Sequence, residues 1–354
     1  RREVEFNEAQ AATGLDLVDD RLFWTALLGA LPERQSMLYA VDGGPLGLAS
    51  RKRGKALAAK PYVVGQWCAL TNGLWALPFE GADLMLMAQT ARYEKWDALV
   101  RRGVFQFPEV WGSGPTGSGG GEDVGELPEV VNGIPQVFAL LPHAASLMRR
   151  GEAKPGPGEF AVSDELRSLK TPSSIPTVPG WDNRAGVVVI DSPFTQGVAG
   201  WQQDEAEPRS SSPARPRTYT LSDLIIEVNS PFAIVMVSAA EPKPIEQARR
   251  LLVTVVGRVQ PTGWLAVDER RRAVADPGQP PLLHEPIKAT IWWRRHATGT
   301  TPPSARPAGS KPTAYALDSE GKRVRPVALP VDGRGARLDL NPDEPRLHWE
   351  LTLD

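Results

Sequence analysis

Residues 60–111 decide the fold expected of this chain, and they read KPYVVGQWCALTNGLWALPFEGADLMLMAQTARYEKWDALVRRGVFQFPEVW. The short apolar run at 62–65 is rich in β-branched residues and predicts a buried parallel strand. A helix is predicted from about residue 79 to 100, because its middle, at 84–88, is apolar nearly all round. A second strand is predicted at 103–107. Strand, helix and strand in this order indicate a βαβ unit.

The ends of these two strands carry side chains typical of a carbohydrate site. Gln66 and Trp67 follow the first strand, and Glu109 and Trp111 follow the second. Ligands of βαβ units bind at the carboxyl ends of the strands. Sugars present hydroxyl groups and flat apolar C–H faces, which suit a carboxylate or an amide beside an indole. The stretch therefore predicts that sugar binds at this edge.

Composition excludes several classes of protein. The chain has 354 residues, 41% of them hydrophobic, which is enough for two domains with their own cores. The net charge of −2 provides no basic field for nucleic acid. No apolar stretch approaches the roughly 18 residues that span a bilayer. The single cysteine, Cys68, excludes an intrachain disulfide, and the four scattered histidines predict neither a metal site nor a cofactor.

The pattern of residue types changes along the chain. Residues 1–151 alternate between helical and strand-like segments, including a helix expected at 21–31 and a second at about 134–150. Residues 152–185 are rich in Pro, Gly and Ser and are typical of a linker. From residue 186 onward, at least seven short β-branched runs occur without helices between them. This pattern predicts an antiparallel β-sandwich at 186–354.

The first part of the chain resembles a known family. The resemblance rests on the sequence KPYVVGQW at 60–67, followed by Asn72, Glu80 and Trp96-Asp97, and it continues through NGIP at 132–135. In these residues the chain resembles the C-terminal half of a clan-A glycoside hydrolase, with a β-sandwich appended. The resemblance implies a (β/α)8 barrel, retaining hydrolysis of a polysaccharide or oligosaccharide, and an extracellular or periplasmic location.

The family resemblance places Gln66 where the retaining nucleophile, a Glu, is expected. An amide cannot form the covalent glycosyl ester that this mechanism requires. Three explanations are open: an engineered Glu→Gln, a natural loss that leaves a sugar-binding pseudoenzyme, or a catalytic pair that has moved to include Glu80 or Glu109. Hydrolysis and binding without catalysis are therefore both expectations for this protein.

Other residues have a functional and a structural interpretation. Glu80 matches a family glutamate, and a structural carboxylate is the alternative. Glu8, in the sequence FNEA at 6–9, resembles the acid/base residue of the family, and a surface loop is the alternative. Trp67 and Trp111 are expected either to stack on a sugar or to pack in the core. Asn72 is expected to bind a hydroxyl group or to form a turn.

The N-terminal part is too short for a complete barrel. A (β/α)8 barrel takes about 200 residues or more, and only about 155 precede the expected sandwich. A fragment, a second chain that supplies the other half, and a reduced barrel are the three explanations. The expected partners are thus a carbohydrate and, in one of the three cases, a second chain.

Overall fold

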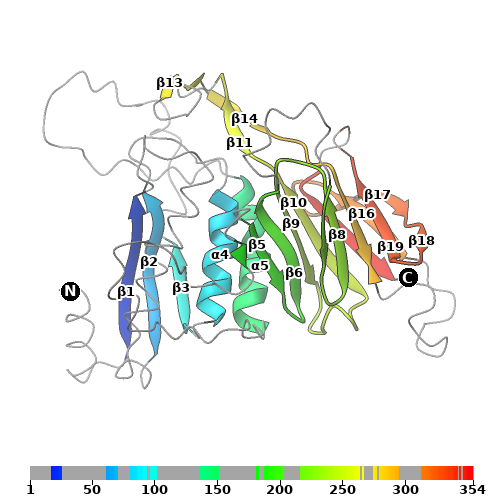
Figure 1. Cartoon of the computed structure of the whole chain (residues 1–354), viewed down its shortest axis with the longest axis horizontal. Helices are drawn as coiled ribbons and strands as arrows, with labels where there is room; N and C mark the ends of the chain where they lie inside the picture. Colours follow the sequence, from blue (N-terminus) through cyan, green and yellow to red (C-terminus); the bar gives the residue numbers. More distant parts are fainter. Residues whose placement is uncertain are drawn as a thin grey trace, which may run out of the picture.

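The computed structural model has four layers. It describes residues 17–25, 61–70, 80–93, 96–101, 135–150, 181–182, 187–202, 216–263, 265–266, 274–276, 279–294, 312–341, 343 and 346–353. Figure 1 shows a small sheet, then two helices, then a large sheet, and finally a second sheet on its far side.

The first layer is a parallel sheet built around a βαβ unit. Its order is β1 (Val18–Thr25), β2 (Tyr62–Leu70) and β3 (Ala98–Arg101), and both strand pairs are parallel. The helix α4 (Glu80–Tyr93) lies between β2 and β3 in sequence. A strand–helix–strand unit is therefore present in this region, but its second strand, β3, starts where the end of the helix had been predicted.

Trp96 and Asp97 join the end of this unit to its beginning. Asp97 accepts a hydrogen bond from the Tyr62 N–H at 2.7 Å, and its own N–H donates to the Tyr62 carbonyl at 2.8 Å. The Trp96 ring packs on the Tyr62 ring with 5.8 Å between centroids. These contacts end the helical segment at Tyr93 and start β3 at Ala98, which is why the predicted helix does not reach residue 100.

Two further expectations for this region are corrected. Residues 21–25 belong to β1, where a helix was predicted, because β1 pairs along its whole length with β2. The strand predicted at 62–65 extends to Leu70, so Gln66 lies within β2 and not at its end. The strand predicted at 103–107 lies outside the described residues.

The predicted (β/α)8 barrel is wrong. Such a barrel has eight parallel strands, each followed by a helix. The described residues contain three parallel strands and two helices, and all other strand pairs among them are antiparallel. The local βαβ signal was real, but the helices cover an antiparallel sheet on their other side. That sheet occupies the place that further βα units would need.

The second helix, α5 (Pro135–Arg150), agrees with the predicted range. It begins with Pro135 in its first turn and ends with Arg149 and Arg150, as the helix dipole favours. Pro142 lies on the exposed side, and the helix continues through it. Val137, Leu140 and Leu147 are fully buried on the opposite side, so α5 is held by one apolar face.

The third layer is an eight-stranded sheet. The fourth layer is a five-stranded antiparallel sheet. In spatial order, the third layer consists of β17 (Arg323–Ala328), β16 (Pro312–Leu317), β20 (His348–Leu353), β10 (Arg250–Val256), β9 (Phe232–Ala239), β6 (Thr195–Trp201), β5 (Val187–Asp191) and β4 (Trp181–Asp182). The fourth layer consists of β18 (Val331–Asp332), β19 (Gly335–Leu340), β15 (Ala289–Trp293), β8 (Leu224–Val228) and β7 (Arg217–Thr220).

Two short strand pairs extend from the sandwich. The pair β11 (Val259–Thr262) and β14 (Gln279–His284) forms an arm that leaves the sandwich directly after β10 and returns before β15. The pair β12 (Leu265–Ala266) and β13 (Val274–Asp276) lies farther along it. The antiparallel strands expected after residue 186 are thus observed, and the short β4 lies within the segment that was expected to be a linker.

The central strand β9 is buried on both faces. Phe232, Ile234 and Met236 belong to the core shared with the helices. Ala233 and Val235 belong to the core between the two antiparallel sheets. A strand covered on both sides needs an almost continuous apolar run, and FAIVMVSA is such a run. The sequence of β9 therefore requires a layer on each side of the large sheet.

A buried polar network connects α5 to the large sheet. His143 is fully buried, and its ring nitrogens lie 2.7 Å from Ser238 Oγ and 2.6 Å from Thr254 Oγ1. The network continues from Ser238 to Thr195 and from Thr254 to His348. Because unpaired polar groups are costly in a core, this network fixes the position of α5 on β9 and β10.

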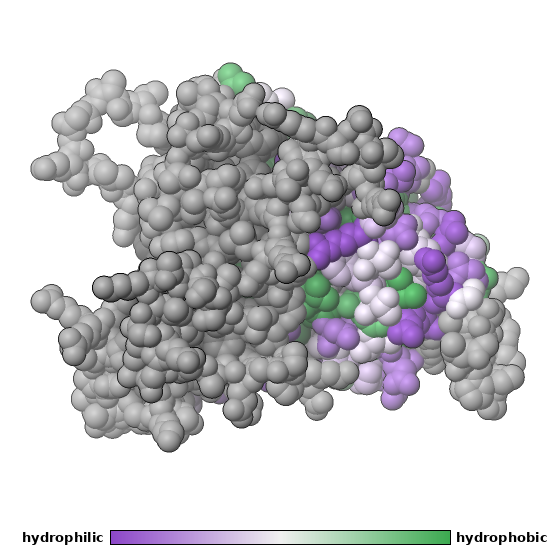
Figure 2. All heavy atoms as spheres, in the orientation of Figure 1, coloured by the Kyte–Doolittle hydropathy of each residue, from purple (hydrophilic) through white to green (hydrophobic). Residues whose placement is uncertain are grey.

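The visible surface of the described strands is mainly hydrophilic. In Figure 2 these residues are purple or pale, with small hydrophobic spots between them. Among the helices that the structure describes, none is long and apolar enough to cross a bilayer.

We expect His143 to make the protein sensitive to acid. Burial, and secondarily His348, lowers the pKa of His143 to about 3, whereas a histidine in an unfolded chain titrates near about 6.5. Between these values the unfolded state binds a proton that the folded state does not, so the free energy of unfolding decreases as the pH falls. In urea titrations from pH 6.5 to pH 4, the free energy of unfolding should fall by up to about 3 kcal/mol less in His143→Gln than in the wild type. Equal losses would contradict this role.

Candidate functional site

The structure places three of the residues predicted for the sugar site. Gln66 lies within β2, where its backbone pairs with Arg21 of β1. Trp67 follows it in β2 and pairs with Leu22 on one side and Arg101 on the other. Glu80 is the first residue of α4. Among these, only Gln66 and Trp67 are neighbours, as consecutive residues of one strand.

The remaining predicted site residues are Glu8, Asn72, Glu109 and Trp111, and they lie outside the described residues. Their catalytic and sugar-binding roles stay predictions. With the barrel corrected, the argument that brought them to one cleft no longer holds. A site that the structure describes has to be sought elsewhere in the chain.

A hollow at one end of the β-sandwich is the candidate that the described residues offer, and we call it the end hollow. It is a shallow depression with a cavity volume of about 20 Å³, and it lies where β10, β14 and β19 end and β20 begins. In Figure 1 this is the base of the arm formed by β11 and β14. Its lining residues are Val255, His284, Pro286, Ile287, Leu340, Asn341, Arg346 and Trp349.

The floor of the end hollow is the end of the sandwich core. Val255, Ile287, Leu340 and Trp349 all belong to the core between the two antiparallel sheets, and each is at least nine-tenths buried. These side chains are held by neighbouring strands, so the floor is rigid and apolar. Because Trp349 is 5% exposed, only a small part of its indole is open to a ligand.

Gly257 allows the chain segments around the end hollow to approach one another. A Cβ at this position would lie 2.2 Å from the Glu285 carbonyl oxygen, which is far inside contact distance. The Glu285 N–H donates to the Arg258 carbonyl at 2.8 Å, and the Gly257 N–H donates to His284 Nε2 at 2.9 Å. The crossing of these two connections therefore depends on a glycine.

His284 is half-buried at the rim, and its hydrogen bond determines its tautomer. Because Nε2 accepts the Gly257 N–H, the neutral ring carries its proton on Nδ1. Burial lowers the pKa of His284, and the neighbouring Glu285 opposes this effect in part. The ring is therefore neutral at pH 7 and presents one N–H donor.

Asn341 and Arg346 complete the polar part of the rim. Both are exposed, and they lie on the connection between β19 and β20. Asn341 Oδ1 accepts the Asp343 N–H at 3.1 Å, which forms a local turn and directs the oxygen to the backbone. Arg346 makes no hydrogen bond or ion pair with another residue in the part of the chain that the structure describes.

The carboxylate next to the end hollow is already paired. Arg258 donates from Nε to Glu285 Oε2 at 2.7 Å and from an Nη to Oε1 at 2.9 Å. Such a two-bond pair is geometrically specific and holds both oxygens of Glu285. Among the described residues that line the end hollow, none carries a carboxylate for acid–base chemistry.

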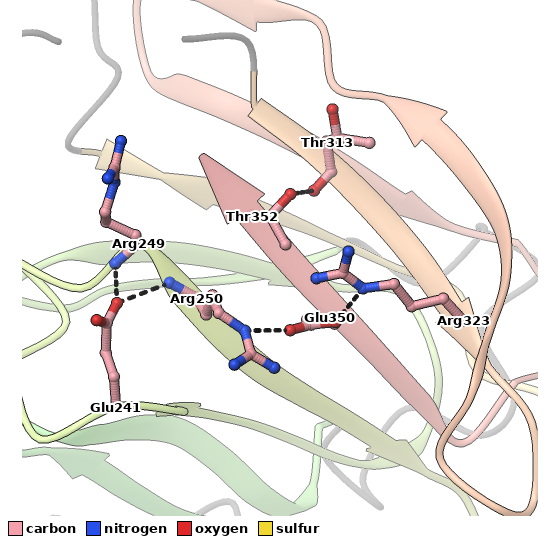
Figure 3. A network of polar contacts seen from close by, with 7 residues as sticks. All are labelled: Glu241, Arg249, Arg250, Thr313, Arg323, Glu350 and Thr352. Carbon is pink, nitrogen blue, oxygen red and sulfur yellow. Dashed lines mark hydrogen bonds and ion pairs between the residues drawn. The ribbon is translucent and has the colours of Figure 1, made fainter. Parts of the chain in front are cut away.

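A second polar cluster lies on β10, β16, β17 and β20, and Figure 3 shows it from close by. Glu350 accepts from Arg250 Nε and from Arg323 Nε, both at 2.6 Å. Burial would raise the pKa of Glu350, but the hydrogen bonds from Arg323 and Arg250 outweigh it and lower the pKa. Arg323 also lies over the Tyr315 ring, with 4.3 Å to its centroid.

The groups of this second cluster are satisfied by one another. Each oxygen of Glu350 has a guanidinium partner, and Glu241 accepts the backbone N–H groups of Arg249 and Arg250. A cluster of this kind stabilises the sheet surface, and a ligand would have to replace bonds that already exist. The end hollow differs because its rim donors are not used in this way.

Sequence analysis did not identify the end hollow. Its residues come from three connections that are far apart in sequence and meet only when the sheets pack. The available signals were Gly257 directly after the β10 run and the turn residues at 341–343. Either signal indicates a turn, and neither indicates a ligand.

No family model matches the sequence, and no curated protein matches it significantly. Within the described part of the chain, no three His, Cys, Asp or Glu side chains are grouped to hold a metal ion. The case for a function therefore rests on the chemistry of the described residues and on the resemblance stated above.

We expect Gly257→Ala to destabilise the protein by about 1–3 kcal/mol, because the new methyl group would meet the Glu285 backbone. Gly333→Ala is the matched control, since nothing lies within 4 Å of a Cβ at that position. Urea unfolding of both variants measures the difference. Equal stabilities of the two variants would contradict the close crossing at Gly257.

Proposed function

We propose that the protein binds carbohydrate in the end hollow and does so without cleaving it. The combination that carries this proposal is an apolar floor containing Trp349 beneath a rim of Asn341, His284 and Arg346. Ligand sites are typically concave and mostly apolar, with a few polar groups that fix orientation. A sugar ring has matching properties, since its C–H faces are apolar and its hydroxyl groups lie around its edge.

The architecture of the sandwich supports binding at this position. Three floor residues, Val255, Leu340 and Trp349, lie in strands, and Ile287 lies just before β15. Among the rim residues, His284 ends β14, and Asn341 and Arg346 lie on the connection between β19 and β20. Loops carried by a rigid scaffold are a common location for binding residues. The end hollow has this arrangement, with β10, β15, β19 and β20 as the scaffold.

Binding without cleavage is also supported by the chemistry of the side chains. A retaining glycosidase needs two carboxyl groups about 5 to 5.5 Å apart, and none of the described residues that line the end hollow carries one. Where the family that the chain resembles has its nucleophile, this chain has Gln66. Among the alternatives for Gln66, we therefore favour a protein that keeps sugar binding without hydrolysis.

We expect the whole chain to bind at least one oligosaccharide of a broad glycan array, with the affinity then measured by calorimetry. Asn341→Ala should weaken that binding about fivefold, the effect of losing one hydrogen bond of roughly 1 kcal/mol. Gln247→Ala is the matched control, because it also removes an exposed amide but lies in the loop before β10, at the other end of that strand.

Three results would contradict the proposal. The first is the absence of binding to every glycan tested, with a protein that melts cooperatively and is therefore folded. The second is an equal loss of affinity in Asn341→Ala and Gln247→Ala. The third is release of reducing ends from the bound glycan by the wild-type protein, which would show hydrolysis and would be followed up with Gln66→Glu.

A further inference from the structure

We infer that the end hollow takes an oxyanion, a carboxylate or a sulfate group carried by an acidic sugar. The inference rests on the proposed function, because it assumes that the end hollow binds carbohydrate, and it adds the chemical class of that carbohydrate. The observation behind it is an imbalance at the rim: the side chains there offer hydrogen-bond donors and almost no acceptors.

The donor at His284 follows from its hydrogen bond to the backbone. Nε2 is occupied as an acceptor by the Gly257 N–H at 2.9 Å. The neutral imidazole then carries its hydrogen on Nδ1, which makes no hydrogen bond with another described residue. The lowered pKa, caused mainly by burial, keeps the ring in this neutral form at pH 7.

Asn341 is converted into a donor by a turn. An asparagine amide has one acceptor oxygen and an NH2 group with two donors. The oxygen accepts the Asp343 N–H at 3.1 Å. The NH2 group has no partner among the described residues, so this side chain offers a ligand mainly its N–H bonds.

Arg346 supplies the charge. A guanidinium group has five donors in a fixed plane and no acceptor, and it matches the two oxygens of a carboxylate or sulfate. Arg346 is exposed and makes no ion pair with a residue that the structure describes. The neighbouring arginine, Arg258, is unlike it in this respect because both oxygens of Glu285 are bound to it.

Among the residues that the structure describes, no acidic side chain lines the end hollow to balance these donors. The lining residues other than His284, Asn341 and Arg346 are apolar. Asp343 is exposed and contributes its backbone N–H to the turn. Since the chain as a whole has a net charge of −2, a general attraction to polyanions does not explain the rim. The local arrangement selects a single negative group.

The proposed function indicates what carries this group. Val255, Ile287 and Trp349 are each at least nine-tenths buried and leave little apolar surface for a ligand, so the carrier is the sugar that the proposed function assigns to the end hollow. A uronic acid bears a carboxylate directly on its ring, and a sulfated sugar bears a sulfate ester. Both place two or more oxygens at the edge of a sugar ring, where the donors of His284, Asn341 and Arg346 could meet them.

The test is affinity gel electrophoresis of the whole chain in four polysaccharides. Polygalacturonate is compared with its methyl ester, and a sulfated galactan is compared with its desulfated form. We expect one acidic polysaccharide to retard the protein with an apparent dissociation constant at least tenfold lower than that of its neutral counterpart. The member that does so distinguishes a carboxylate from a sulfate.

The variants test whether Arg346 causes the preference. Arg346→Gln should weaken acidic binding about tenfold to a hundredfold, in line with a charge-assisted pair. Arg149→Gln, the control with the same charge change in the last turn of α5, should have little effect. Asp343→Asn should strengthen acidic binding about twofold, because it removes an exposed negative charge near the rim.

The outcomes separate this inference from the proposed function. Equal binding of acidic and neutral members overturns the oxyanion while carbohydrate binding stands. Binding of no polysaccharide, neutral or acidic, overturns both. Equal losses in Arg346→Gln and Arg149→Gln, or equal retardation by single-stranded DNA, would show non-specific electrostatic attraction and overturn the inference.

Discussion

The rest of the structure depends on the burial of the eight-stranded sheet on both faces. Its central strand β9 has Phe232, Ile234 and Met236 against the helices and Val235 and Val237 against the second sheet. Neither set can be left in water without a large loss of hydrophobic stabilisation. The helices must therefore cover one face of the eight-stranded sheet and the five-stranded sheet the other. This requirement gives the order of the four layers. The buried bonds of His143 to Ser238 and Thr254 then allow one position of α5 on this sheet.

Much of the antiparallel part of the fold was predictable from the sequence, because its strands are short β-branched runs between turn residues. The runs at 187–190, 224–228 and 289–293 correspond to β5, β8 and β15 with shifts of one residue at most. The βαβ unit at the start was predictable for the same local reason. Its extension to a barrel was not justified, because a βαβ unit does not determine how many further units follow. Which strands cover the second face of the helices depends on contacts between residues far apart in sequence. Here residues of β5, β6 and β9 cover it.

The candidate site was beyond prediction from the sequence for a different reason. Gln66 and Trp67 were identified from a local pattern, and the structure places them inside a strand. The end hollow depends on residues from Val255 to Trp349 that meet through sheet packing, with Gly257 permitting the contact. Its chemistry depends on which atoms of His284 and Asn341 are already bonded. These hydrogen bonds arise from the three-dimensional fold and not from local sequence, and they distinguish the end hollow from the cluster around Glu350, whose groups bond to one another.

The most direct test of this account is a crystal structure of the whole chain with a bound acidic oligosaccharide, such as a short oligogalacturonate. The account predicts electron density for a sugar ring at the rim of the end hollow, with its carboxylate beside Arg346 and Asn341. Density on the face that carries Arg250, Glu350 and Arg323, or at the end of β2 beyond Gln66, would contradict it. In the first case a surface ion-pair cluster would be the binding site, and in the second the site expected from the family resemblance would be restored.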